Sequence, residues 1–187
     1  MYDERISALD WPPYALAEDD EETKQFRANY LALLTMCDTY LGYILDFMDE
    51  HDMWNDTMLM INTDHGFLLG EHGYYAKNYM PTYDELCHLP FFLWDPVSGK
   101  KGERNQQLAQ TIDLAPTLLE FHHQKIPKEM QGESLLSNVR KNVPLLRKYA
   151  LFGSFGKHVN ITDGRYVYMR AGQKEILNNY TLMPTHL

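Results

Sequence analysis

Apolar side chains recur at spacings of three and four residues between positions 21 and 51. This spacing places them on one face of an α-helix, because each helical turn contains about 3.6 residues. The repeating positions are Phe26, Tyr30, Leu33, Leu34, Cys37, Leu41, Ile44, Leu45 and Met48. Gly42 interrupts the pattern at some cost, since glycine favours a helix less than alanine does. The pattern therefore predicts one long helix over residues 21–51.

Two short, continuous apolar runs follow this helix, at residues 57–62 and 89–94. Turn-forming residues bound them, with Asn-Asp at 55–56 before the first run and Asp-Pro at 95–96 after the second. A continuous apolar run of this length suits a strand that is buried on both faces, as in a parallel sheet. A helix followed by such a strand is half of a βαβ unit. The order predicts an α/β fold, with a mostly parallel sheet flanked by helices.

Residues 111–122 return to a helical pattern. Its apolar members are Leu114, Leu118, Leu119 and Phe121. Pro116 fits the first turn of this helix if Asp113 caps it, because proline needs no backbone partner there.

The last part of the chain has a different pattern, with short strand-like stretches separated by turns. These stretches are 149–155, 159–162 and 165–170. The turns are Gly-Lys at 156–157 and Asp-Gly at 163–164, and Asp-Gly is a strong hairpin signal. We therefore predict two parts: residues 1–145 in the α/β domain, and residues 146–187 as a small antiparallel β segment.

Composition and charge exclude some classes of partner. The chain has 187 residues, of which 44% are hydrophobic, as in ordinary globular proteins. The formal net charge of −9 argues against a nucleic-acid partner, which would require a basic face. No uninterrupted apolar run approaches the roughly 20 residues that span a bilayer, and no signal peptide is visible. We expect no membrane partner. The location of the protein stays open, with the cytoplasm slightly favoured.

The residues with candidate chemistry begin where the first predicted strand ends. In open α/β sheets, ligands bind just outside the carboxyl ends of the strands. Asp64 and His65 lie there, directly before Gly66. Neighbouring side chains on a strand point to opposite faces, so both can reach one metal ion only if the strand has ended. Gly66 would permit the required turn.

Other readings of these residues are open from the sequence alone. Asp-His-Gly also suits a capped turn, since Asp and Gly both favour turns. His72 fits a loop-supporting role better than a ligand role, and Lys77 by itself resembles a surface lysine. Cys37 and Cys87 match no paired metal motif and are predicted to be small buried hydrophobic residues, although a disulfide stays open.

The order of motifs along the chain resembles the sulfatase family of the alkaline phosphatase superfamily. The matching motifs are Thr-Asp-His-Gly at 63–66, Leu-Gly-Glu-His-Gly at 69–73, Lys77, Leu-Pro-Phe-Phe at 89–92, Thr-Ile-Asp-Leu-Ala-Pro-Thr-Leu-Leu at 111–119 and Gly-Glu-Ser-Leu at 132–135. Each motif is only moderately specific, but their combination is specific. The resemblance runs from about Tyr30 to Tyr168.

This resemblance implies roles for individual residues. Asp64 and His65 match the pair that binds the catalytic divalent ion, and Lys77 matches the lysine that contacts the sulfate and bridging oxygens. Histidine at the second position is similar to the phosphonate monoester hydrolase branch and to several bacterial sulfatases. The family implies Ca²⁺, while an imidazole ligand also admits Mn²⁺ or Mg²⁺. Asp113, Pro116 and Thr117 match a structural helix and are assigned no chemistry.

The family nucleophile is absent from this sequence. Sulfatases carry it in a Cys/Ser-x-Pro/Ala-x-Arg motif that is converted to formylglycine, and neither Cys37 nor Cys87 lies in such a motif. We therefore expect the C-terminal half of a metal-dependent sulfuric ester hydrolase, inactive alone, with formylglycine in the missing N-terminal half. The expected substrate is a small-molecule or carbohydrate sulfate ester. Self-association through the face left by the missing half is a further expectation.

Two alternatives remain from the sequence. The first is another hydrolase or transferase of the superfamily: a phosphonate or phosphodiester hydrolase, or a phosphoglycerol transferase. All of these enzymes need a metal ion and a tetrahedral anion, so Asp-His-Gly does not separate them. The second is a non-catalytic module on a sulfatase-like scaffold.

Overall fold

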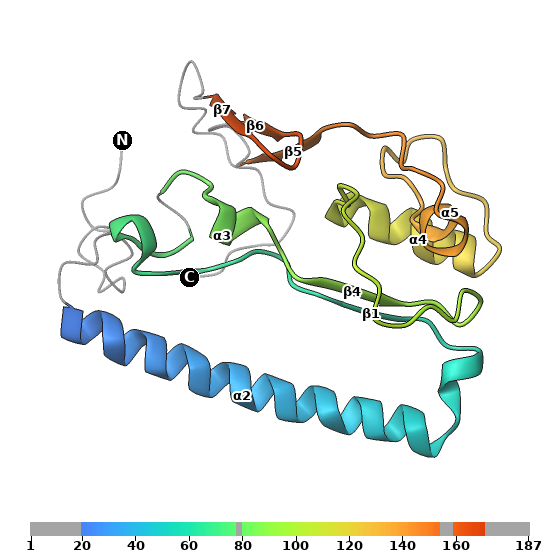
Figure 1. The fold of residues 1–187 in the computed structure, drawn as a ribbon, viewed down its shortest axis with the longest axis horizontal. Coiled ribbons are helices and arrows are strands. Elements are labelled where there is room, and N and C mark those ends of the chain that lie inside the picture. Colours follow the sequence, from blue (N-terminus) through green and yellow to red (C-terminus); the bar gives the residue numbers. More distant parts are fainter. Residues whose placement is uncertain (1–19, 78–79, 154–158, 171–187) are drawn as a thin grey trace, which may run out of the picture. The chain divides into compact units, whose positions relative to one another are not determined.

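The computed structural model of the chain describes residues 20–77, 80–153 and 159–170 (Figure 1). These residues form two compact units, which divide after Gly99. The domain boundary expected near residue 145 stays a prediction.

Unit 1 begins with the long helix α2 (Asp20–Glu50) and the short helix η1 (Met53–Asn55). The elements that follow are β1 (Leu59–Asn62), β2 (Leu68–Leu69), η2 (Glu71–Gly73), β3 (Tyr75–Ala76), α3 (Asp84–Cys87) and β4 (Phe91–Trp94). The helix predicted over 21–51 and the strands predicted within 57–62 and 89–94 are therefore confirmed. Three acidic residues occupy the first turn of α2, where they complement the helix dipole.

The direction of the β1–β4 pairing differs from the prediction. β1 and β4 pair antiparallel, with Leu59 opposite Trp94 and Asn62 opposite Phe91. Every strand pairing in the described residues is antiparallel, so the mostly parallel sheet is not confirmed. Both strands are also largely half-buried, whereas the sequence suggested burial on both faces. A continuous apolar run indicates that both faces of a strand are apolar, but it does not indicate the direction of the strand beside it.

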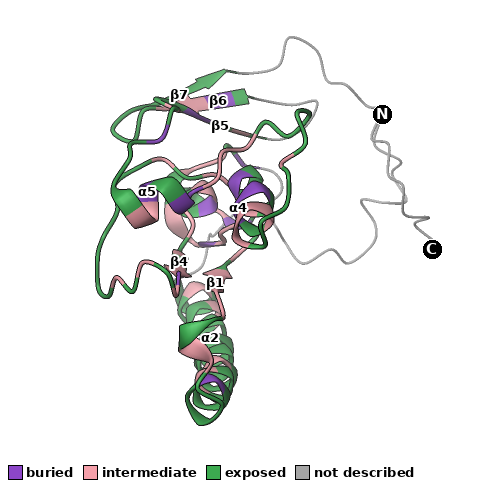
Figure 2. Cartoon of the chain, turned by 90° about the vertical axis from the view of Figure 1, so that its right-hand side faces the viewer, coloured by how far each residue is buried: buried purple, intermediate pink, exposed green. Residues whose placement is uncertain are grey.

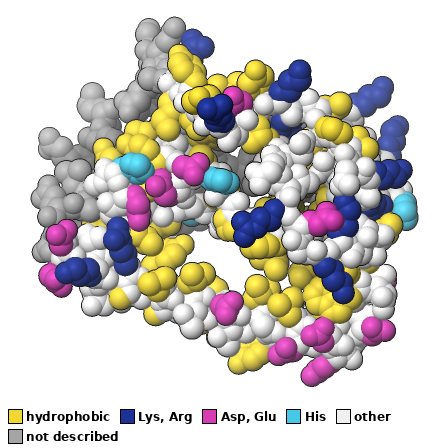
Figure 3. Space-filling model, in the orientation of Figure 1, with side chains coloured by type: hydrophobic (Ala, Val, Ile, Leu, Met, Phe, Trp, Pro, Cys, Tyr) yellow, Lys and Arg dark blue, Asp and Glu magenta, His cyan; other side chains and the backbone are white. Residues whose placement is uncertain are grey.

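Helix α2 packs through only part of its length. Near its start, the Phe26 ring lies 4.8 Å from the Tyr75 ring, and the Tyr30 ring stacks 5.8 Å from the Phe67 ring. Farther along, large apolar side chains are exposed, and Figures 2 and 3 show this surface along α2. Leu31 and Leu34 are two of them. The others share one side of the helix, which we call the apolar face of α2: Leu33, Met36, Tyr40, Tyr43, Ile44 and Phe47.

By length and composition alone, α2 is also able to cross a membrane. Its apolar residues are interrupted by polar ones, so no continuous apolar run in the sequence marks it. The core helix of a water-soluble domain meets the same criterion, so α2 does not establish a membrane span. The structure gives no support to a cytoplasmic location either.

Unit 2 contains η3 (Thr111–Asp113), α4 (Leu114–Phe121) and α5 (Leu136–Lys141). A three-stranded sheet follows, formed by β5 (Ala150–Gly153), β6 (Val159–Thr162) and β7 (Val167–Arg170) in the order β5-β6-β7. Both pairings are antiparallel, which confirms the antiparallel strands predicted between residues 149 and 170. The predicted Gly-Lys turn at 156–157 and residues 171–187 of the predicted segment lie outside the described residues. The turn between β6 and β7 contains Gly164 at a φ of +87° and the Asp163 carboxylate, which accepts backbone hydrogen bonds from Arg165 and Tyr166.

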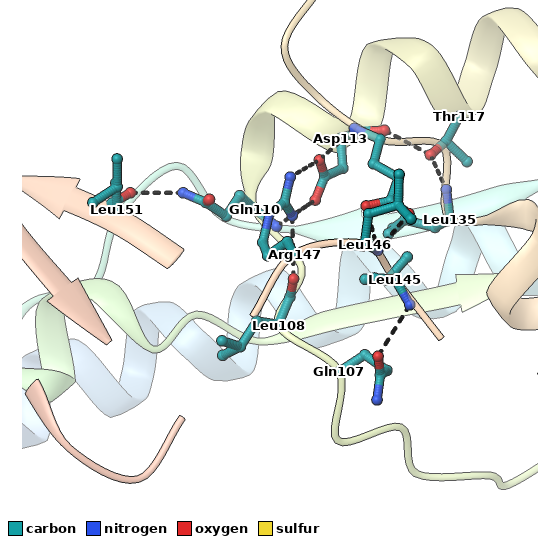
Figure 4. A network of polar contacts seen from close by, with 11 residues as sticks. Gln107, Leu108, Gln110, Asp113, Thr117, Leu135, Leu145, Leu146, Arg147 and Leu151 are labelled. Atoms are coloured by element: carbon teal, nitrogen blue, oxygen red, sulfur yellow. Dashed lines mark hydrogen bonds and ion pairs between the residues drawn. The ribbon is translucent and has the colours of Figure 1, made fainter. Parts of the chain in front are cut away.

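A buried ion pair joins the segments of unit 2 (Figure 4). The Asp113 side chain is 0% exposed and the Arg147 side chain is 11% exposed, and the guanidinium donates to both carboxylate oxygens. The backbone N–H groups of Gln110 and Glu133 donate to the same carboxylate, at 2.8 and 2.9 Å. Asp113 therefore makes no side-chain cap on α4, contrary to the expected role, although Pro116 does lie in the first turn.

The environment of Asp113 sets its ionisation. Burial by itself raises the pKa of the Asp113 carboxyl. The hydrogen bonds from Arg147, Glu133 and Gln110 outweigh burial, and they hold that pKa below its ordinary value. The carboxylate is therefore charged at neutral pH, and the surrounding donors satisfy it.

Candidate functional site

The candidate site begins where β1 ends. Asp64 and His65 follow the strand after one residue, and their side chains are 82% and 37% exposed. The Asp64 Oδ1 accepts the backbone N–H of His65 at 3.0 Å. This contact leaves Oδ2 of the same carboxylate directed to the His65 ring, whose Nε2 lies 3.2 Å away.

The hydrogen bonds of His65 determine which ring nitrogen carries the proton. Nδ1 lies 2.9 Å from the carbonyl oxygen of Gly66. A carbonyl can only accept, so Nδ1 is the donating nitrogen and Nε2 is the nitrogen placed to act as a metal ligand. Metal-bound histidines commonly use this arrangement, in which the second nitrogen donates to a backbone carbonyl. The Asp64 Oδ2 and the His65 Nε2 lie 3.2 Å apart, so both atoms can face one bound cation.

Lys77 is the third residue at this place. Its Nζ contacts Nε2 of His65, so its ammonium can donate to the ring lone pair. The chain reaches Lys77 through Ala76, which is buried and has a φ of 69°. That left-handed conformation is uncommon for a residue other than glycine. The structure thus brings together Asp64, His65 and Lys77, the three residues singled out from the sequence.

The donor set fits a partial metal shell. Asp64 offers a carboxylate and His65 offers Nε2, which suit a divalent ion. Among residues 20–77, 80–153 and 159–170, no group of three or more His, Cys, Asp or Glu side chains is arranged to hold a metal ion. A divalent ion at this pair would therefore need further ligands from water or from elsewhere.

Gly66 is required for close packing. Its backbone N–H donates to the carbonyl of Leu86 at 3.0 Å, and a Cβ at this position would lie 1.7 Å from the carbonyl oxygen of Glu85. The sharp turn predicted at this glycine is not what requires it, because its φ is not positive. The absence of a side chain instead lets the loop lie directly on the backbone of α3.

Gly66→Ala should therefore destabilise unit 1 and displace the loop that carries His65. We expect the free energy of unfolding to fall by about 3 kcal/mol, the upper end of typical overpacking costs. The matched control is Gly42→Ala inside α2, where a Cβ meets nothing within 4 Å. That change should stabilise the chain by about 0.5–1 kcal/mol. Urea unfolding followed by circular dichroism measures both, and equal effects of the two changes would contradict this assignment.

His72 contacts α3. Its Nε2 lies 3.1 Å from Oε2 of Glu85, and its ring stacks on Tyr83 with centroids 3.9 Å apart and planes at 12°. Its own φ is 57°, and Gly70 and Gly73 on either side also have positive φ. These contacts agree with the loop-supporting interpretation of His72.

Sequence reasoning missed several residues that hold these loops. The Arg27 Nε of α2 donates to the carbonyl of Leu69 at 2.8 Å, and a Glu71 oxygen accepts the N–H of Leu69. Glu71 lies in a motif that the sequence analysis had identified, so it carried a signal. No sequence signal marked Arg27 or Glu85, because a charged residue outside any motif cannot be told from a charged residue on a solvated surface.

The two cysteines differ in environment. Burial, assisted by the nearby charges of Asp84 and Glu85, raises the pKa of the Cys87 thiol to about 11. The thiol is therefore protonated at neutral pH and is a poor nucleophile. Cys37 is exposed on α2 and Cys87 is half-buried, so the expectation that both cysteines are buried is wrong for Cys37 and met only in part for Cys87. Neither cysteine forms a disulfide.

Comparison with known proteins gives one consistent family. A family model described as Sulfatase matches residues 10–123. The N-acetylglucosamine-6-O-sulfatase of Bacteroides thetaiotaomicron is 31% identical over 160 residues, which cover 84% of this chain and 28% of that protein. An arylsulfatase of Clostridium perfringens is 30% identical over 146 residues, which cover 74% of this chain and 30% of the relative. The chain thus spans less than a third of the length of these relatives.

Solved structures show the same fold. A protein solved in complex with its substrate D-glucosamine-2-N,6-O-disulfate has a TM-score of 0.73 and 24% identity, with 89% of this chain and 35% of that chain covered. The phosphonate monoester hydrolase SpPMH from Silicibacter pomeroyi has a TM-score of 0.68 and 24% identity, with 82% and 36% covered. At these identities the likeness establishes the α/β fold alone.

Proposed function

The chain belongs to the sulfatase family, and from this premise we propose that it supplies the metal-binding pair and the substrate-facing lysine of a sulfuric ester hydrolase. One observation carries the proposal. Asp64 Oδ2, His65 Nε2 and Lys77 Nζ converge at the end of β1, although Lys77 lies twelve residues after His65 in the sequence. That convergence supports a site for an anion and its counter-cation.

Each of the three residues has a distinct role in this proposal. Asp64 and His65 hold a divalent ion, which when bound polarises the ester oxygens. The Gly66 carbonyl fixes the His65 tautomer so that Nε2 is available as the ligand. The Lys77 ammonium supplies fixed positive charge where the leaving oxygen gains negative charge.

The donors admit three divalent ions. Ca²⁺ is the ion that the family implies, and the Asp64 carboxylate suits it. The His65 nitrogen shifts the preference toward Mn²⁺, and Mg²⁺ is also accommodated by a carboxylate with waters.

The nucleophile of the proposed reaction lies outside these 187 residues. Neither cysteine is followed by the formylglycine motif, and the Cys87 thiol is protonated at neutral pH. The proposal therefore assigns a formylglycine to other sequence, and we expect the 187-residue chain alone to be inactive.

A carbohydrate sulfate is the proposed substrate. The relatives that support it are the N-acetylglucosamine-6-O-sulfatase and the protein solved with a glucosamine disulfate. The second candidate is a phosphonate or phosphodiester ester, which the histidine at position 65 and the likeness to a phosphonate monoester hydrolase favour. A non-catalytic module is disfavoured, because Asp64, His65 and Lys77 are all present and in contact.

An ester panel tests this function. The complete polypeptide that carries this sequence is assayed with N-acetylglucosamine-6-sulfate, an aryl sulfate, a phosphonate monoester and a phosphodiester. We expect metal-dependent release of sulfate from the sugar, abolished by Asp64→Ala. Faster turnover of the phosphonate ester would select the second candidate. Turnover that persists in Asp64→Ala would remove this site from the reaction.

A further inference from the structure

We propose that Glu85 is a positioning residue, which ties the loop of His65 and the loop leading to Lys77 to one short helix, α3. The inference rests on the proposed function, since it concerns how the three residues of that site are held together. Glu85 makes one contact with each loop, the first through its side chain and the second through its backbone.

The side chain of Glu85 holds the loop that precedes Lys77. Its two carboxylate oxygens lie 3.1 and 3.2 Å from Nε2 of His72, and the two side chains are 38% and 41% exposed. The His72 ring also stacks on Tyr83, which packs against the buried cluster of Leu68, Met80 and Leu86. His72 is thus fixed both by the Glu85 carboxylate and by the aromatic ring that precedes α3.

The backbone of Glu85 holds the loop that carries His65. Its carbonyl oxygen occupies the space next to Gly66 where a side chain would otherwise lie, 1.7 Å from an added Cβ. The next residue, Leu86, accepts the backbone N–H of Gly66 at 3.0 Å. The backbone position of His65 therefore depends on α3 through its immediate neighbour.

The two loops meet again at the site. From His72 the chain continues through β3 to Lys77, and β3 pairs with β2 through Leu68 opposite Ala76. Lys77 then contacts His65, which completes a closed circuit of contacts through Glu85. The segment from Gly70 to Gly73 contains three residues at positive φ and is a turn closed by its own backbone hydrogen bonds, from Gly73 to Gly70 and from Tyr74 to Glu71. It can therefore move as one piece, and the contact between His72 and Glu85 ties it to α3. Loss of the Glu85 carboxylate should release this segment and separate Lys77 from His65.

The same helix offers a matched control. Asp84 pairs with His88 at 3.2 Å, a carboxylate–histidine contact of the same length as those of Glu85, but both side chains are more than 70% exposed. Asp84→Ala therefore removes a similar interaction from α3 without touching either loop. If Glu85 only stabilised α3, Asp84→Ala and Glu85→Ala should have equal effects on Lys77.

The experiment measures acetylation of Lys77 in the 187-residue chain, by mass spectrometry after a short exposure to an amine-reactive ester. Lys24 serves as the internal standard, and His65→Ala defines the labelling rate of a released Lys77. We expect Glu85→Ala to raise the rate at Lys77 by about tenfold, the factor that corresponds to one charge-assisted hydrogen bond. Glu85→Gln, which can still accept from His72, should stay within about twofold of the unaltered chain, and Asp84→Ala should not change the rate.

A second variant keeps the test informative if Glu85→Ala fails to fold. His72→Phe retains an aromatic ring on Tyr83 but cannot bond Glu85, and we expect the same release of Lys77. Unchanged labelling in both variants would overturn the inference, as would an equal increase in Asp84→Ala or a Glu85→Gln that behaves like alanine. The assay involves no hydrolysis. Failure of the ester panel therefore leaves its result intact, and a negative labelling result leaves the ester panel untouched.

Discussion

Arg147→Met should lower the free energy of unfolding by about 3–5 kcal/mol, the usual cost of removing one partner from a buried ion pair. The Asp113 carboxylate is fully buried and would lose the guanidinium that bonds both of its oxygens. The backbone donors of Gln110 and Glu133 would remain, but they bring no compensating charge. Arg147 also donates to the carbonyl of Leu108 at 3.1 Å, so that contact would be lost as well.

Urea unfolding at neutral pH measures the loss, with Arg165→Met as the control. The Arg165 guanidinium lies over an exposed tyrosine ring at 5.0 Å, and its removal should change stability by about 1 kcal/mol or less. The double variant Asp113→Asn, Arg147→Met should recover part of the loss, because no unpaired charge remains. A loss in Arg147→Met no larger than in Arg165→Met would show that the pair does not stabilise unit 2.

The same ion pair predicts a pH dependence. The pKa of Asp113 is lowered in the folded chain, so its stabilisation is present above the ordinary aspartate pKa of about 3.9. It is lost as the pH falls through the lowered folded-state value. In Arg147→Met the buried carboxylate is unpaired, and protonation relieves its cost. The stability difference between the two proteins should therefore shrink as the solution is acidified from pH 7 toward pH 3.

Lys77→Ala should lower kcat by about 10²–10³ in the complete polypeptide that carries this sequence, the usual effect of removing one positioned electrostatic donor. Asp64→Ala should cost at least as much and should also weaken metal retention. His72→Ala should cost less, since His72 contacts Glu85 and Tyr83 and makes no contact with the converging atoms of the site.

Steady-state kinetics with a sulfate ester tests this prediction, and circular dichroism checks the fold of each variant. Lys125→Ala, a change at an exposed lysine of unit 2, provides the control and should leave kcat unaltered. An unchanged kcat/KM in Lys77→Ala would reduce Lys77 to a surface lysine and leave Asp64 and His65 as the remaining support for the site.

Local patterns predicted the longer helices and the strands of this fold, but not the short elements β2, η2, β3, α3 and α5. The three- and four-residue spacing over residues 21–51 predicted α2, and Asp163-Gly164 predicted the β6–β7 turn. The direction of β4 relative to β1 was not predictable from its residues, because an apolar run looks the same in either direction. The exposed face of α2 was equally hidden, since periodicity shows that a helix has an apolar face but not whether that face is covered.

Some residues of the candidate site could be predicted from the sequence, and others could not. Asp64, His65 and Lys77 were singled out because the order of motifs along the whole chain resembles the sulfatase family, whereas each of the three alone also fits a turn or a solvated surface. The importance of Glu85 was not visible, because one of its two contacts is made by a carbonyl oxygen that every residue possesses. Asp113 and Arg147 are 34 positions apart, and nothing in either local sequence marks them as partners.

The different reactivities of the two cysteines allow a probe to be attached to α2 alone. Thiol-reactive reagents attack the thiolate, so Cys87, with a pKa of about 11, should react slowly at neutral pH. Cys37 is exposed in the middle of the apolar face of α2. A maleimide fluorophore should therefore label this single position without any mutagenesis. Its emission would shift to shorter wavelength whenever another surface, including a second copy of the chain, covers that face.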